Sequence, residues 1–184
     1  MKTKFILHGG FMKGVRQEDD NFFREILKTA PENTKILLVY FAEPPEKVDQ
    51  RREEDLDSFN RNRGSKVVSF DIATEKDFLK QIESSDIIYL HGGGSARIME
   101  ILKQYSGIEE LFKGKIVAGD SAGANVLTRA FYSTTGGGLM YGLGIIPIKL
   151  ICHYTPDKEG RLDGISDDLE TLKLKEFEIR TYEI

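Results

Sequence analysis

Five short apolar runs, each followed by a longer polar segment, constrain the fold of this chain more than any other feature. The runs are KFILHG (4–9), KILLVYFA (35–42), KVVSFDI (66–72), DIIYLHG (86–92) and KIVAGD (115–120). Their Ile, Leu, Val and aromatic residues do not alternate strictly with polar ones, which is typical of strands buried on both faces. The segments compatible with helices are about 17–30, 45–63, 75–84, 96–105 and 122–130. The pattern predicts βαβ units, and hence a doubly wound, three-layer α/β fold with helices on both faces of a mostly parallel sheet.

The last third of the chain is organised differently. Residues 131–148 contain five glycines and no helical period, so we expect a hairpin or loop near the strand ends. A sixth apolar run, IKLICHY (148–154), follows, and then come a polar segment at about 161–175, predicted to be helical, and a final strand at 177–184. A length of 184 residues suits a single domain spanning 1–184.

Composition excludes several classes of protein. The net charge is −4, and Lys and Arg are interspersed with Asp and Glu, which argues against a nucleic-acid partner. The single cysteine, Cys152, excludes an internal disulfide and a Cys-rich zinc site, and we expect no metal. No apolar run is long enough for a membrane span or a signal peptide, so we expect a cytoplasmic protein without a membrane partner. Exposed edge strands in such sheets often pair, which leaves a homodimer open.

The stretch GDSAG (119–123) has the G-x-S-x-G pattern of a nucleophile elbow. It follows a predicted buried strand and precedes a predicted helix, as that motif requires. Small residues let strand and helix approach closely around Ser121, and the helix amides then point toward the reaction centre. The competing interpretation is a simple strand-to-helix turn with a Ser or Asp cap. The position between strand and helix favours a nucleophile.

A serine nucleophile needs a base, and the chain has three histidines. His153 lies at the carboxyl end of the sixth apolar run, at the same sheet edge as Ser121, and is the best candidate by position. His8 and His91 also end strands, but each is followed by glycines and is expected to be part of the loop framework. Its alternative is a packed histidine at a strand end. The glycines of HGGG (91–94) expose backbone amides that could complete an oxyanion hole with the amide of Ala122. A phosphate-binding loop is disfavoured, since no P-loop or G-x-G-x-x-G spacing is present.

Three motifs in the same order and spacing resemble those of the peptidase E (aspartyl dipeptidase) and cyanophycinase family of serine peptidases. They are LHGGGSARIMEIL (90–102), GDSAGANVL (119–127) and GLGIIPIKLICHYTPDKEGRLDGI (142–165). The resemblance implies a class I glutamine-amidotransferase-like fold. It also implies that Ser121 is the nucleophile and His153 the general base, with Gly93 or Gly94 and Ala122 forming the oxyanion hole.

The chain departs from the family pattern at two places. Ser95 stands where the family usually has Asn, so a hydroxyl replaces an amide that positions substrate or holds the loop. No Asp or Glu lies between Ser121 and His153 to act as the third catalytic residue. Glu183 or Asp157 could orient His153, or a water could, or the chain is shorter than a complete family member.

The resemblance implies hydrolysis of short peptides with an aspartyl residue at the N-terminus, without a cofactor. Such substrates require a cation near the site for the aspartyl carboxylate. Arg97, Arg129 and Arg161 are candidates, and Arg161 is favoured because a Gly-Arg pair follows the histidine similarly in the family. Two rival functions stay open: an esterase or amidase that uses the same Ser–His pair, and a non-catalytic binding or regulatory homologue that lacks the third acidic residue.

Overall fold

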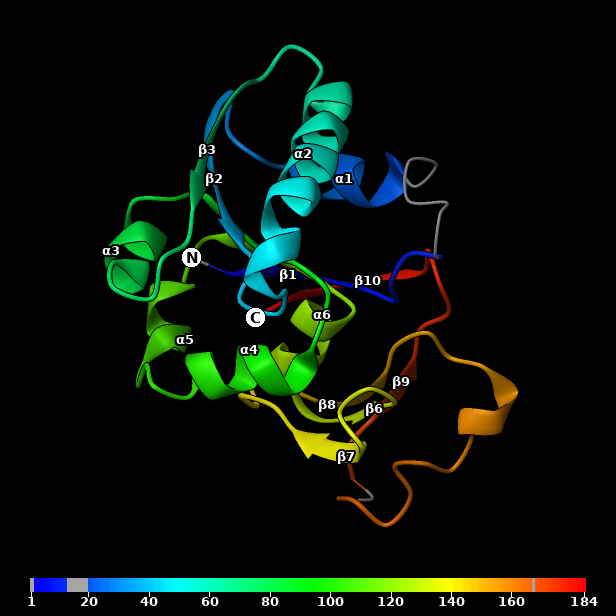
Figure 1. The fold of residues 1–184 in the computed structure, drawn as a ribbon. Coiled ribbons are helices and arrows are strands. Elements are labelled where there is room, and N and C mark those ends of the chain that lie inside the picture. The colour runs from blue at the N-terminus through cyan, green and yellow to red at the C-terminus, as the bar shows by residue number, and fades with distance from the viewer. Residues whose placement is uncertain (1, 13–19, 167) are drawn as a thin grey trace.

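The computed structural model describes residues 2–12, 20–166 and 168–184. Its larger sheet has six strands in the order β10-β1-β5-β4-β2-β3 (Figure 1). The strand bounds are β1 (Lys4–His8), β2 (Asn33–Val39), β3 (Val67–Ile72), β4 (Ile87–Leu90), β5 (Ile116–Asp120) and β10 (Ile179–Glu183). β1 to β5 are parallel and correspond to the five apolar runs, whereas β10 pairs antiparallel with β1. The predicted mostly parallel α/β sheet is therefore confirmed.

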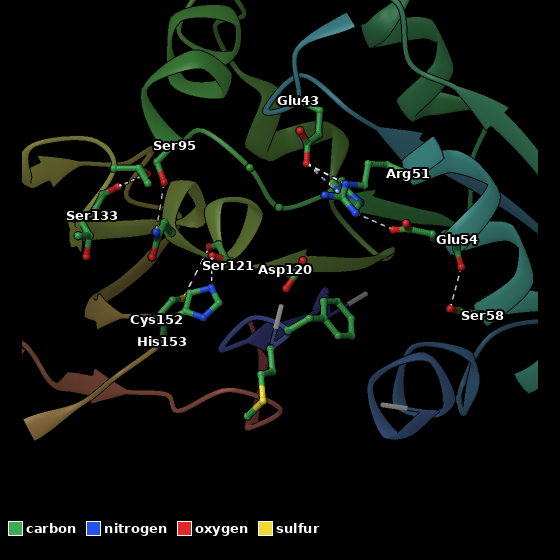
Figure 2. A pocket seen from close by; sticks show the side chains of 18 of the residues that line it. Glu43, Arg51, Glu54, Ser58, Ser95, Asp120, Ser121, Ser133, Cys152 and His153 are labelled. Atoms are coloured by element: carbon green, nitrogen blue, oxygen red, sulfur yellow. Dashed lines mark hydrogen bonds and ion pairs between the residues drawn. The ribbon is translucent and has the colours of Figure 1, made fainter. Parts of the chain in front are cut away.

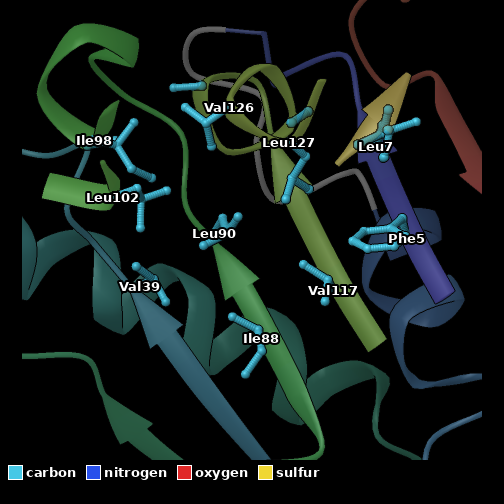
Figure 3. Close-up of a cluster of buried hydrophobic side chains, with 14 of the residues drawn as sticks. Phe5, Leu7, Val39, Ile88, Leu90, Ile98, Leu102, Val117, Val126 and Leu127 are labelled. Carbon is cyan, nitrogen blue, oxygen red and sulfur yellow. The ribbon is translucent and has the colours of Figure 1, made fainter. Parts of the chain in front are cut away.

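Helices cover both faces of this sheet. Their bounds are α1 (Asp20–Leu27), α2 (Pro45–Asn62), α3 (Phe78–Glu83), α4 (Ser95–Leu102), α5 (Ile108–Leu111) and α6 (Ala122–Leu127). α1 and α2 pack on one face, where Ile36 and Leu38 of β2 point. The other four helices pack on the opposite face with Leu37 and Val39 of the same strand (Figure 3). The short α5 was not predicted, and the expected start of the first helix at residue 17 lies outside the described residues.

A second sheet of four strands, β7-β6-β8-β9, packs beside α6. It consists of β6 (Thr128–Ser133), β7 (Gly138–Tyr141), β8 (Ile146–Ile151) and β9 (Thr171–Lys173). β6 and β7 form the expected hairpin, and the sixth apolar run supplies β8. The predicted helix at 161–175 is wrong. Turns and β9 occupy the described part of it, and the buried Leu172 and Leu174 have the two-residue spacing of a strand.

Residues 156–158 form a short 3₁₀ helix, η2 (Pro156–Lys158), in the connection between β8 and β9. Within the described ranges, no helix is both long enough and apolar enough to cross a membrane.

Candidate active site

Ser121 occupies a strained turn between β5 and α6. Its backbone φ is +45°, a region that residues with a side chain rarely adopt. A Cβ added at Gly123 would lie 2.0 Å from the carbonyl oxygen of Leu90, so α6 packs this closely on β4 only with glycine there. The local geometry is the strand, sharp turn and helix of a nucleophile elbow.

Ser121 lies within hydrogen-bond distance of the predicted base. Its Oγ is 3.1 Å from Nε2 of His153, and Figure 2 shows the two side chains facing each other. On the other side of the ring, Nδ1 of His153 is 3.2 Å from Oε1 of Glu176. When Nδ1 carries the proton and donates it to this carboxylate, Nε2 is left as an acceptor for the Ser121 hydroxyl. The three side chains thus form a connected Ser–His–Glu array.

The carboxyl end of β1 holds the three segments of this array together. Three successive carbonyl oxygens each accept a backbone N–H from a different part of the chain. The Ser121 N–H donates to His8 at 3.1 Å, and the His153 N–H donates to Gly9 at 2.8 Å. The N–H of Phe177, the residue after Glu176, donates to Gly10 at 3.0 Å. The HGG turn at 8–10 is therefore the scaffold of the array.

Gly10 also provides the space for the histidine ring. A Cβ at this position would lie 2.2 Å from both Cε1 and Nε2 of His153. Any side chain at residue 10 would displace the imidazole from Ser121. This steric requirement explains why the loop after β1 contains glycine.

Neither acidic residue suggested by the sequence lies beside His153. Glu183 pairs with Lys4, which lies at the opposite end of β1 from His8. Asp157 is exposed on η2, and a hydrogen bond from the Thr155 hydroxyl lowers the pKa of its carboxyl. Sequence reasoning missed Glu176. No local signal marks it: its place follows from the antiparallel direction of β10, which starts at the edge of the sheet where the parallel strands end.

Two of the three predicted oxyanion-hole amides are free to bind an anion. The Gly94 N–H donates to the carbonyl oxygen of Ala42 at 2.8 Å and is occupied. Among the described residues, the N–H groups of Gly93 and Ala122 have no acceptor. Gly93 has a φ of +128°, which turns the loop in a way that favours glycine.

A cavity of about 1020 Å³ opens in front of Ser121 and His153. One wall is neutral and polar, with side chains from α4, α6 and the β6–β7 hairpin. These residues are Ser95, Asn125, Tyr132, Ser133, Thr134 and Thr135. The Asn125 amide donates to Ser95 Oγ at 3.3 Å, which ties α4, the helix after the HGGG loop, to α6, the helix after Ser121. The Asn125 Oδ1 atom is buried and has no donor among the described residues.

The opposite wall is charged, as the right side of Figure 2 shows. Glu43 lies 3.4 Å from Nε of Arg51 and 3.6 Å from Nε2 of His91. The hydrogen bond from His91 is the main cause that lowers the pKa of the Glu43 carboxyl. His91 Nδ1 in turn lies 2.8 Å from the fully buried Asp55, which also accepts the hydroxyl of Tyr40 at 2.9 Å. His91 thus anchors the wall in place.

The predicted cations lie at different distances from the cavity. Arg161 places its guanidinium 5.5 Å from the ring centroid of Tyr132, so it borders the cavity through that ring. Arg97 and Arg129 do not line it, whereas Lys158, which the sequence did not single out, does.

Cys152 lines the cavity but is poorly suited to nucleophilic attack. Its thiol is buried, and burial raises its pKa far above the usual range. The Sγ atom lies 3.6 Å from the carbonyl oxygen of Ser121 and 3.7 Å from that of His8, so a thiol proton has backbone acceptors. A neutral buried thiol is unreactive.

A strained serine on a parallel sheet, contacting a histidine that contacts a carboxylate, is the arrangement of a serine hydrolase. The chain belongs to peptidase family S51, whose family model matches residues 5–177. It is a serine-type peptidase, and the resemblance to the peptidase E family is confirmed.

Two solved structures share the fold at low sequence identity. A putative peptidase E protein from Listeria monocytogenes EGD-e is 14% identical with a TM-score of 0.67, covering 100% of this chain and 98% of that one. A peptidase from an acI-B1 Actinobacterium is 17% identical with a TM-score of 0.65, covering 99% of this chain and 84% of that one. A search of curated proteins finds no significant match.

Proposed function

We propose that the chain hydrolyses short peptides, with Ser121 as nucleophile, His153 as general base and Glu176 as the group that orients His153. The observation that carries the proposal is the 3.1 Å contact between Ser121 Oγ and His153 Nε2, with Glu176 on the far side of the ring. Glu176 supplies the carboxylate whose absence would have favoured a non-catalytic homologue. The geometry therefore supports catalysis best.

The reaction proceeds through an acyl-enzyme. Ser121 Oγ attacks the peptide carbonyl as Nε2 of His153 takes the hydroxyl proton, and the Gly93 and Ala122 amides stabilise the oxyanion. His153 then gives the proton to the leaving amine. Water attacks the acyl-enzyme by the same route, with His153 again as base, and releases Ser121 and the carboxylic acid product.

An N-terminal aspartyl residue is the substrate feature that we propose to test first. The resemblance implies it, and the similar structure from Listeria bears the name of a putative peptidase E protein. The cavity in front of Ser121 contains polar and charged side chains suited to a small, charged peptide. No step of the proposed reaction uses a cofactor or a metal.

The decisive experiment compares the wild type with Ser121→Ala on Asp-X dipeptides, other dipeptides and p-nitrophenyl esters. We expect peptide hydrolysis that falls by about 10⁴-fold or more in the variant, because the nucleophile is lost. Ser84→Ala, an exposed serine outside the cavity, is the matched control and should keep full activity. Turnover of esters alone would replace the peptidase assignment with an esterase, and undiminished peptide hydrolysis by Ser121→Ala would refute the nucleophile.

A further inference from the structure

Three Lys and Arg side chains line the cavity among the described residues, and they differ in whether a carboxylate already neutralises them. Arg51 lies 2.8 Å from Glu54 and also pairs with Glu43, and Arg61 lies 2.9 Å from Asp20. Lys158 has no carboxylate within the 4.0 Å limit of an ion pair anywhere in the described part of the chain. The neighbouring carboxylate of Asp157 is exposed and interacts with Lys158 only beyond that limit, so the ammonium can still pair with a ligand's carboxylate.

The position of Lys158 is fixed beside the catalytic histidine. It is the last residue of η2 and is half-buried, and its Nζ donates a hydrogen bond to the backbone carbonyl oxygen of His153. An ammonium group has three N–H donors, so one is used by this carbonyl and two remain for a ligand. Because the ammonium is already anchored and partly removed from water, a ligand in the cavity loses less free energy in ordering it.

The remaining walls do not offer a second site for an anion. The charged wall carries Glu43 and Glu54, which repel a carboxylate and already neutralise Arg51. The neutral wall presents hydroxyl and amide groups, and its Asn125 Oδ1 is an unpaired acceptor that also disfavours an anion. Arg161 reaches the cavity only through the ring of Tyr132.

We propose that Lys158 is a specificity-determining residue that binds a carboxylate of the substrate. The inference rests on the proposed peptidase function. A dipeptide with an N-terminal aspartyl residue has two such groups, the aspartyl side chain and the free C-terminus, and the charge-assisted hydrogen bond is the same for both. In either case the salt link places the scissile carbonyl with respect to Ser121, because Lys158 is held on the backbone of His153.

The test measures kcat and KM of the wild type, Lys158→Met and Lys158→Arg on Asp-Leu, Asn-Leu and the C-terminal amide of Asp-Leu. We expect Lys158→Met to lower kcat/KM for Asp-Leu by about 10- to 100-fold, chiefly through KM, as for loss of a hydrogen bond to a charged group. The substrate that lacks the bound carboxylate should be insensitive: Asn-Leu if Lys158 binds the side chain, the amide if it binds the C-terminus. Lys158→Arg, which keeps the charge, should retain most of the activity.

Controls separate this role from a structural one. Lys103→Met removes an exposed lysine at the end of α4 and should leave all three substrates unchanged. If Lys158 only supported the His153 backbone, Lys158→Met would lower kcat equally for all substrates, and that result would overturn the proposal. No change on any substrate would overturn it as well. A wild type that hydrolyses neither these three peptides nor any other dipeptide of the panel above would instead refute the proposed function, and the inference with it.

Discussion

In the proposed reaction, Glu176 acts only by orienting the imidazole ring of His153. Its carboxylate contacts Nδ1 of His153 at 3.2 Å, and about a third of each side chain is exposed, 36% for Glu176 and 38% for His153. Water therefore competes with the carboxylate for the imidazole proton. We therefore propose that Glu176 contributes mainly by fixing the tautomer and the rotation of the ring that present Nε2 to Ser121.

We expect Glu176→Gln to lower kcat by about 10²- to 10⁴-fold with little change in KM, because an amide does not hold the productive tautomer. Steady-state kinetics on the best dipeptide measures the effect. Glu183→Gln is the matched control, since Glu183 lies at the other end of β1, and its kcat should equal that of the wild type. A Glu176→Gln enzyme with wild-type kcat would show that His153 needs no carboxylate.

The sequence can predict a candidate site residue when that residue directly follows a recognisable strand. Ser121 and His153 follow buried apolar runs and carry side chains of the right chemistry, which is why the sequence indicated both. Glu176 precedes a strand, and its place at the site depends on the direction of β10 relative to β1. Strand direction is set by tertiary packing, which local patterns do not encode.

At the scale of the elements, the elbow depends on the contact of α6 with the central strands. Leu90 ends β4 at 0% exposure, and its carbonyl oxygen lies against Gly123 of α6. The hydrophobic residues of α6, Val126 and Leu127, pack in the same cluster (Figure 3). The helix that follows Ser121 is thus held at a distance that permits no side chain at residue 123.

Gly123→Ala should therefore destabilise the fold by about 3 kcal/mol, because the methyl group must displace backbone rather than a flexible side chain. Urea unfolding followed by circular dichroism measures the change, and the peptidase activity of the folded fraction should fall as α6 shifts. Gly64→Ala is the control. Residue 64 has open space around it and a φ of +59°, so only the backbone cost of about 1 to 2 kcal/mol is expected. Equal losses for the two variants would contradict the packing argument.

The elements differed in how well the sequence predicted them, for a physical reason. The five parallel strands are buried on both faces and give continuous apolar runs, so the runs identified them. β8 also gives an apolar run, but its assignment to the second sheet depends on its pairing with β6 and β9, which no local pattern specifies. The segment at 161–175 resembled a helix in composition alone, since among its described residues the buried hydrophobic side chains are three leucines, Leu162, Leu172 and Leu174.

At the scale of the whole molecule, buried polar links connect the layers. Asp55 of α2 accepts hydrogen bonds from Tyr40, Tyr89 and His91, which follow or belong to the central strands. Glu43 extends this network to the cavity wall through His91. A network of this kind is stabilising only while every member is satisfied, so loss of a carboxylate charge affects the packing of α2 on the sheet.

This arrangement predicts that the fold loses stability in acid. The hydrogen bond from His91 holds the pKa of Glu43 below its ordinary value of 4.5, and a bond from the Asn62 amide lowers the pKa of Asp20 from 3.8. A carboxyl whose pKa is lower in the folded state stabilises the fold above its unfolded-state value, and this contribution disappears as the pH falls through the folded-state value. The urea midpoint should therefore be steady from about pH 5.5 to 7 and fall below about pH 4.5.

Glu43→Gln tests whether this carboxylate is responsible. At pH 6 the variant should be less stable than the wild type. At pH 3.5 the difference should be smaller, because Glu43 of the wild type loses its negative charge as the pH falls, whereas the glutamine has no charge to lose. Urea midpoints at the two pH values measure the difference. Glu100→Gln, an exposed position on α4, should keep the full wild-type dependence. If the midpoint of Glu43→Gln fell with acid as steeply as that of the wild type, the acid sensitivity would have to come from other carboxylates than the one on the cavity wall.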